Sequence, residues 1–281
     1  MPLTADITLG GRFMGLFVGA NGTGKTIAAA SFPGPVLILD FDGRVRPVRF
    51  FYPKRRDIEY WTVGLEGDNR KDVIGFIEFC DRLEKLQDRC PYETVIIDSY
   101  TSYSGTAILH QMGYKDAKDV KRTKGGLPIP DWDEYKGETG VALQILEVAK
   151  SLPAHFIMTA HPVSKATTTK QGGSTNEVLA SMIKSSTLAT YGWKTVSFLP
   201  NYFDEMYYFF NEVSSQMGQI IERKIQTVSV GEIVAKTALP LPATINVTGK
   251  PFYPLLQAIL KEYDIKMQEK AKAEGGVEVA V

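Results

Sequence analysis

The 281-residue sequence predicts an α/β fold with a mostly parallel sheet flanked by helices and an antiparallel extension of C-terminal strands. Short apolar runs alternate with helical patterns as far as about residue 160, as in sheets built from strand–helix–strand units. The strands are nearly all apolar, which indicates a sheet covered on both faces. After about residue 205 the predicted strands follow one another without helices between them.

The parallel part of the sheet is expected to contain five strands. Each is a short apolar run that ends at a glycine or a polar residue, as expected where a buried strand meets a turn. The runs lie at residues 13–18, 36–39, 58–63, 94–97 and 154–160. Strands of the extension are predicted at residues 206–210, 218–225 and 232–236.

Helices are predicted between these strands and at the end of the chain. Asp68 is expected to cap the second helix, so Val73 and Ile74 would lie on its apolar face. Asp131 and Glu134 have the spacing of a capping box at the start of the third. The helices are placed at residues 24–32, from 68 past 86, 131–149 and 252–267.

A single domain is predicted at residues 13–270, between an N-terminal segment at 1–12 and a flexible tail at 271–281. Two segments, 115–130 and 162–177, are rich in polar residues, glycine and proline, and are expected to be loops. Loops of this length in a compact domain are usually functional or disordered.

Charge and cysteine content limit the possible functions. Lys plus Arg and Asp plus Glu both number 32, so any binding of nucleic acid must come from local basic patches. Cys80 and Cys90 lack metal-ligand spacing and predict free thiols in a reducing compartment. Neither a secretory signal nor an apolar run of membrane-spanning length is predicted. We therefore expect a cytoplasmic protein, in the host cytoplasm if the protein is viral.

Residues 19–26 fit the phosphate-binding pattern GxxxxGK[ST] at every fixed position. The glycines allow the backbone to curl so that successive amides point at phosphate oxygens, and the following helix adds its positive N-terminal end. Lys25 is expected to reach the β- and γ-phosphates, and Thr26 to ligate Mg²⁺. No NKxD guanine motif is present, which favours ATP. The predicted cradle consists of Gly19, Ala20, Asn21, Gly22, Thr23, Gly24, Lys25 and Thr26.

A second acidic element supports a nucleotide site. Asp98 ends the apolar run 94–97, and an acid at the end of a neighbouring strand would point into the ligand crevice of such a sheet. There it would hold Mg²⁺ directly or through water. The alternative is that Asp98 only caps the helix that follows it.

These features together resemble the bacteriophage nucleotide-binding ATPases of the RecA-like group, several of which act in single-strand annealing recombination. The resemblance covers most of residues 13–247, and its P-loop is specific to the superfamily. Besides the P-loop it rests on LDFDG at 39–43, VIIDS at 95–99, TAHP at 159–162, FDE at 203–205 and VAK at 234–236.

The resemblance implies roles for two residues at strand ends. Asp42 would activate the attacking water, although the family more often has glutamate here and Asp40 is a competitor. Both acids could instead cap a turn around Gly43. His161 would sense the γ-phosphate, or it is simply a turn histidine ahead of Pro162.

RecA-like ATPases often place a basic residue of one subunit against the γ-phosphate bound by the next. Lys236 matches that position, with Arg223 and Lys224 as alternatives. If Lys236 has this role, the protein would work as a ring or filament. The alternative is that Lys236 is an ordinary solvent-exposed lysine of a strand, which would carry no information about assembly.

The resemblance also implies that the two long loops face single-stranded DNA. The candidate contacts are Lys121, Arg122, Lys124, Lys165 and Lys170. Few aromatic residues accompany them, and plain solvated loops are the alternative. A further basic cluster after the second strand fits nucleic acid, a neighbouring subunit or solvent, and contains Arg44, Arg46, Arg49, Lys54, Arg55 and Arg56.

Two functions therefore remain open. One is a DNA-dependent ATPase of phage-type recombination or annealing, with a phage or host replication or recombination protein as its expected partner. The other is an ATP-dependent assembly or loading factor that binds a helicase or a viral component without acting on DNA itself. ATP and Mg²⁺ are the expected cofactors of both.

Overall fold

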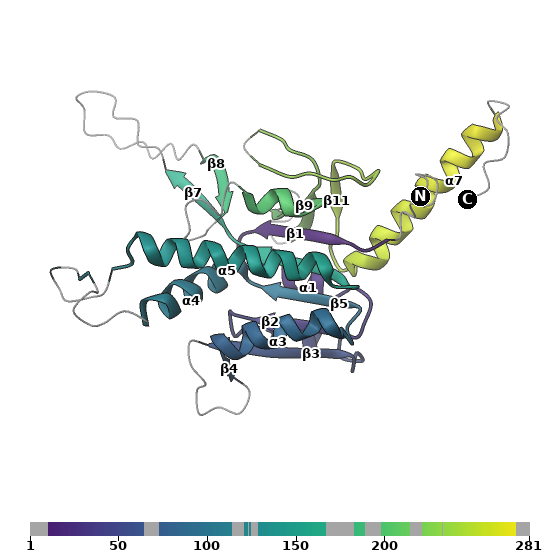
Figure 1. Ribbon diagram of the computed structural model, residues 1–281. Helices are drawn as coiled ribbons and strands as arrows, with labels where there is room; N and C mark the ends of the chain where they lie inside the picture. Colours follow the sequence, from purple (N-terminus) through teal and green to yellow (C-terminus); the bar gives the residue numbers. More distant parts are fainter. Residues whose placement is uncertain are drawn as a thin grey trace, which may run out of the picture.

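The computed structural model describes residues 11–64, 73–113, 121–122, 124, 129–166, 183–188, 198–213, 221–231 and 233–273. A nine-stranded sheet with the order β11-β10-β9-β1-β6-β5-β2-β3-β4 forms its centre (Figure 1). Neighbouring strands from β9 to β4 are parallel, and β9, β10 and β11 pair antiparallel. This arrangement confirms the predicted fold class. The strands are β1 (Met14–Gly19), β2 (Val36–Asp40), β3 (Ile58–Gly64), β4 (Val73–Gly75), β5 (Thr94–Asp98), β6 (His155–Ala160), β9 (Glu205–Val213), β10 (Ile221–Gln226) and β11 (Thr244–Asn246).

Helices pack on both faces of the sheet, which explains why its central strands are mostly apolar. β1, β2 and β5 are buried at every residue. One core lies under α3 (Phe76–Asp88), α4 (Tyr100–Gly113) and α5 (Trp132–Ser151). The opposite core lies under α1 (Lys25–Ala29), α2 (Arg46–Phe51) and α7 (Phe252–Ala273).

Aromatic side chains fix α7 against β1, which leads to the phosphate loop, and against the neighbouring strand β9. Phe17 of β1 stacks on Tyr207 of β9 with ring centroids 5.8 Å apart. Phe252, at the start of α7, meets both rings edge-on at 5.8 Å. Because such rings are large and rigid, the start of α7 is held beside the end of β1.

The C-terminal strands differ from the prediction in their pairing. β9 runs parallel to β1, so only β10 and β11 form the antiparallel extension. Residues 233–236 form isolated bridges in place of the predicted strand, and residue 232 lies outside the described residues. β11 was not predicted, because its three residues leave too short a pattern.

The secondary structure also differs from the prediction at two shorter segments. Val73 and Ile74 belong to β4 and precede α3, since two adjacent apolar residues fit a short strand as well as a helix. Asp68 lies outside the described residues. Residues 162–166 form β7 (Pro162–Ala166), which pairs with β8 (Ile183–Leu188), where a loop was expected. The described helices include none that is long and apolar enough to cross a membrane.

Candidate nucleotide site

The phosphate loop joins the end of β1 to the start of α1, the context that its sequence pattern requires. Gly22 and Gly24 have φ angles of 78° and 96°, in the left-handed region that favours glycine. A Cβ atom on Gly19 would lie 2.4 Å from the carbonyl oxygen of Phe209 in β9. Three glycines of the pattern are therefore required by backbone geometry, before any ligand is considered.

Asp98 lies at the carboxyl end of β5, and β6 separates β5 from β1. The expectation that Asp98 ends a strand adjacent to the P-loop strand was therefore wrong. The side chain still reaches the loop, because Thr26 Oγ1 donates a 2.8 Å hydrogen bond to Asp98 Oδ2. Thr159 of β6 donates a 2.5 Å hydrogen bond to the other carboxylate oxygen.

The pair of Thr26 and Asp98 has the donor chemistry that Mg²⁺ prefers, a hydroxyl and a carboxylate oxygen. Asp98 is 4% exposed, and burial raises its pKa despite the hydrogen bonds from Thr159 and Thr26. A divalent cation would compensate this buried negative charge, so the residues fit the metal of a nucleotide site.

Lys25 lies within the curl of the loop. Its Nζ donates hydrogen bonds to the carbonyl oxygens of Gly19 and Ala20, at 2.8 and 3.0 Å. Burial lowers its pKa to about 8, against the opposing attraction of Asp98 and Asp42. A buried ammonium with two neutral acceptors is a strong partner for a phosphate group.

Asp42 and His161 approach Lys25 from two other strand ends. His161 Nδ1 lies 3.4 Å from Lys25 Nζ and 3.3 Å from the Gly19 carbonyl oxygen. Its Nε2 lies 3.8 Å from Asp42 Oδ2. The imidazole therefore bridges the loop lysine and the carboxylate.

The carboxylate of Asp42 is held in place by hydroxyl groups. Ser99 donates a 3.1 Å hydrogen bond to its Oδ1, and Ser102 donates to the same atom. Burial favours the neutral form of Asp42, but the hydrogen bonds from His161, Ser102 and Ser99 outweigh it and lower its pKa. Asp42 is therefore ionised at neutral pH.

Asp40 is arranged differently from Asp42. It is 1% exposed and accepts the backbone amides of Arg44 and Val45 at 3.2 and 3.3 Å. Burial raises its pKa. These contacts fit a cap for the turn between β2 and α2, which was one of the alternatives raised by the sequence.

Two adjoining cavities lie at this edge of the sheet. The first, of about 230 Å³, is lined by Lys25, Thr26, Asp42, Asp98 and His161 among others. The second, of about 310 Å³, shares Gly24, Ile27, Phe51 and Arg223 with the first and extends to Val247 and to residues 249–252. The first cavity is lined mainly by polar and charged side chains and suits a phosphate tail, whereas the second has apolar side chains that suit a base.

Arg223 reaches these cavities from β10 of the same chain. Its guanidinium lies 5.5 Å from the centre of the Phe51 ring, and its Cδ lies 3.5 Å from where a Cβ on Gly24 would be. Sequence reasoning considered Arg223 only as a residue acting on a neighbouring subunit. The position of Phe51 was not predicted, because α2 itself was not.

The remaining candidate residues that the structure describes are not among those lining the two cavities. Lys236 is exposed and pairs with Met206 near the start of β9, whereas Gly19 of the loop is opposite Phe209 further along that strand. Lys121, Arg122 and Lys124 are exposed, and Lys121 forms a 2.7 Å ion pair with Asp131. Lys165 belongs to β7, and Lys170 lies outside the described residues.

The fold and the loop geometry define a P-loop nucleoside triphosphatase. Residues 12–239 match the model of a family described as an AAA domain. The chain belongs to this family of nucleotide-binding ATPases. It matches no curated protein.

Proposed function

We propose that this protein hydrolyses Mg²⁺-bound ATP in the two adjoining cavities and couples turnover to single-stranded DNA, in recombination or annealing of the phage type. The observation that carries the hydrolytic part is the convergence of five side chains on one cavity from the ends of different strands. They are Lys25, Thr26, Asp42, Asp98 and His161.

Each group has a role that its contacts support. The loop amides and Lys25 would bind the phosphates, and Thr26 and Asp98 would hold Mg²⁺, which supplies charge neutralisation when bound. Asp42 would orient and deprotonate the attacking water, because it is ionised and has hydrogen-bonding partners that fix its carboxylate. His161 would sense whether a γ-phosphate is present through its contact with Lys25.

The nucleoside would occupy the second cavity. Phe51 and Arg223 offer flat surfaces for the base, and Val247 and Phe252 form its apolar side. Arg223 would then contact ATP in its own subunit, which differs from a role across a subunit boundary. Lys236 remains the candidate for that second role.

Coupling to DNA is supported by continuity of the chain. α4 begins two residues after Asp98 and leads to the segment with Lys121, Arg122 and Lys124. β7 begins directly after His161 and carries Lys165. A change at the γ-phosphate would therefore be passed directly to β7 and, through α4, towards the segment with Lys121.

A second candidate is an assembly factor whose nucleotide state governs a protein partner. Val230 and Val234 are 55% and 48% exposed in the segment that ends at Lys236, which pairs with Met206 of β9. Exposed apolar residues next to a cation suit a protein surface better than a nucleic acid. The same surface would also serve self-association into a ring or filament.

Steady-state ATPase assays with and without an oligothymidylate test the proposal, with Lys25→Ala as the inactive reference. We expect Mg²⁺-dependent hydrolysis that DNA stimulates, and loss of stimulation in a Lys121→Ala/Arg122→Ala/Lys124→Ala variant. Lys85→Ala/Arg89→Ala is a matched control on an exposed helix end. Hydrolysis that persists in Lys25→Ala would refute the site, and DNA-independent turnover would favour the assembly factor.

A further inference from the structure

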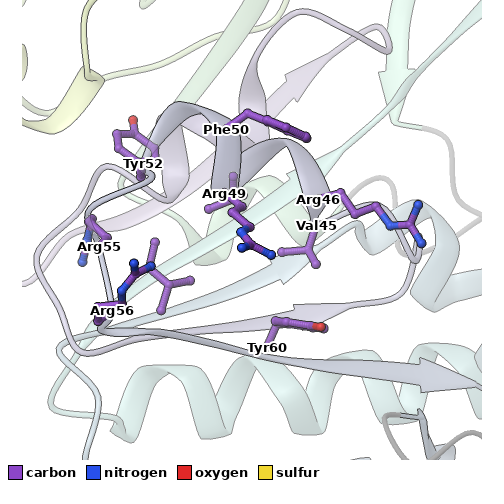
Figure 2. A pocket seen from close by; sticks show the side chains of 10 residues that line it. Val45, Arg46, Arg49, Phe50, Tyr52, Arg55, Arg56 and Tyr60 are labelled. Atoms are coloured by element: carbon purple, nitrogen blue, oxygen red, sulfur yellow. The ribbon is translucent and has the colours of Figure 1, made fainter.

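A third cavity, of about 550 Å³, lies between α2 and β3, outside the nucleotide site (Figure 2). We call it the basic pocket. Its walls carry Arg46, Arg49 and Phe50 from α2, Arg56 from the following turn, and Tyr60 from β3. Figure 2 shows Arg49 directed from α2 towards the strand that carries Tyr60.

The basic pocket carries positive charge that the described residues leave largely uncompensated. Arg46 and Arg49 are exposed, and Arg56 donates only a 3.2 Å hydrogen bond to the Pro53 carbonyl oxygen. No carboxylate is among the residues that line it in the described part of the chain. Arg55 differs, since it is already engaged by Asp57. An anion is therefore the ligand that this pocket favours.

Aromatic rings accompany the charges. Phe50 is 81% exposed and Tyr60 is 47% exposed, although both are large. Alternation explains why Tyr60 faces the pocket while Glu59 faces away, where it accepts hydrogen bonds from Trp61 and Tyr92. An exposed ring beside a guanidinium can stack on a flat partner, and guanidinium groups bind phosphate in a bidentate manner.

We propose that the basic pocket binds single-stranded nucleic acid, with Arg46, Arg49 and Arg56 on phosphates and Phe50 and Tyr60 stacking on bases. This combination of a basic groove and stacking rings is how proteins hold single strands without reading their sequence. An acidic protein segment would pair with the arginines, but it would cover both rings only if it also carried aromatic side chains, whereas every nucleotide brings a flat base with its phosphate. The proposal deepens the proposed function, on whose choice of single-stranded DNA it rests, and assigns a site separate from the two loops.

The test is fluorescence anisotropy of a labelled oligothymidylate of about 20 nucleotides, with the full chain, Mg²⁺ and a nonhydrolysable ATP analogue. Arg46→Ala/Arg49→Ala should raise the Kd at least about 10-fold. The slope of log K against log salt, which is negative, should become smaller in magnitude by about 0.7 per lost phosphate contact. Phe50→Ala should raise the Kd about 5-fold and leave that slope unchanged. Matched controls are Arg89→Ala for an exposed arginine and Tyr263→Ala for an exposed ring.

The outcomes separate this inference from the proposed function. Wild-type binding that the pocket variants leave unchanged would overturn the pocket and leave the ATPase and its loops intact. Failure of the wild-type protein to bind the oligonucleotide, with ATP hydrolysis retained, would overturn both DNA assignments but not the nucleotide site. Equal competition by an oligoglutamate peptide with interspersed phenylalanines would show a pocket for acidic protein segments, and would overturn the nucleic-acid assignment.

Discussion

The hydroxyl of Thr26 donates a hydrogen bond to the carboxylate of Asp98, although β6 lies between the strands that lead to these two residues. Thr159 of β6 completes the link by donating to the other oxygen of the same carboxylate. The intervening strand thus supports the acidic side chain as well as separating the two motifs.

Asp98→Asn should raise the Mg²⁺ concentration needed for half-maximal ATPase activity by about 10- to 100-fold, because the charge that attracts the metal is lost. Thermal stability should change little, since burial opposes the charged carboxylate while the asparagine keeps only one of the two oxygens that accept from Thr26 and Thr159. Magnesium titrations of the ATPase rate measure the effect, and Thr26→Ser, which keeps a hydroxyl, is the control. An unchanged requirement in Asp98→Asn would exclude Asp98 as part of the metal site.

Asp42→Asn should lower kcat by about 10²- to 10⁴-fold and leave ATP binding intact, as expected for loss of a general base. Asp40→Asn is the matched comparison, and should remain within a few-fold of wild type because its carboxylate is occupied by two backbone amides. Single-turnover rates with a parallel binding assay distinguish the two. A larger loss of kcat in Asp40→Asn than in Asp42→Asn would instead make Asp40 the general base.

The pH dependence of ATP affinity should follow Lys25. Its pKa is lowered to about 8, so the nucleotide-free protein loses the phosphate-binding charge as the pH rises through that value. ATP binds the protonated form, and its affinity should therefore fall above pH 8, approaching 10-fold per pH unit. Titrations of a fluorescent ATP analogue between pH 6.5 and 9.5 measure this. In Lys25→Arg, whose guanidinium stays charged, the pH dependence should disappear, and a flat wild-type profile would contradict the assignment.

Arg223→Ala should weaken ATP binding by about 5- to 10-fold, because Arg223 lines both cavities within its own chain. Lys236→Ala should bind ATP normally, as its side chain lies outside them. If Lys236 completes the site of a neighbouring copy, mixing inactive Lys236→Ala with inactive Lys25→Ala should restore part of the ATPase activity. Absence of any recovery, with mixed assembly verified, would remove Lys236 from catalysis.

Glu205→Ala should destabilise the fold by about 3 kcal/mol, because three donors lose their acceptor and one of them, the Tyr207 hydroxyl, is buried. Glu205 is 3% exposed and accepts hydrogen bonds from Tyr207 at 2.5 Å, Thr237 at 2.6 Å and the Ala238 amide at 2.9 Å. Denaturant unfolding measures the loss. Glu212→Ala, at an exposed site of β9, should change stability by less than about 0.5 kcal/mol.

The sequence could predict those features of the molecule that depend on residues close to one another in the chain. The P-loop is one continuous stretch, and Asp98 ends an unmistakable buried strand. In a parallel sheet such strand ends meet at one edge, so their proximity follows without knowing the strand order.

What could not be predicted depends on contacts between distant segments. The parallel pairing of β9 with β1 joins residues about 190 positions apart in the sequence, so no local sequence pattern could predict it. The same holds for Arg223 and Phe51, which meet only because β10 and α2 border the same loop. The basic pocket was visible in the sequence as a cluster of arginines, but its cavity and exposed rings required the fold.

The helix α2 has only six residues, and its two sides border different cavities. Pro47 and Phe51 line the nucleotide cavity, whereas Arg46 and Arg49 line the basic pocket. Because α2 is so short, it would move as a rigid unit. A ligand that displaces α2 from one cavity would therefore also move the α2 side chains that line the other cavity. Thermodynamic reciprocity then requires that each ligand alter the affinity of the other by the same factor, and a single coupling constant would describe both.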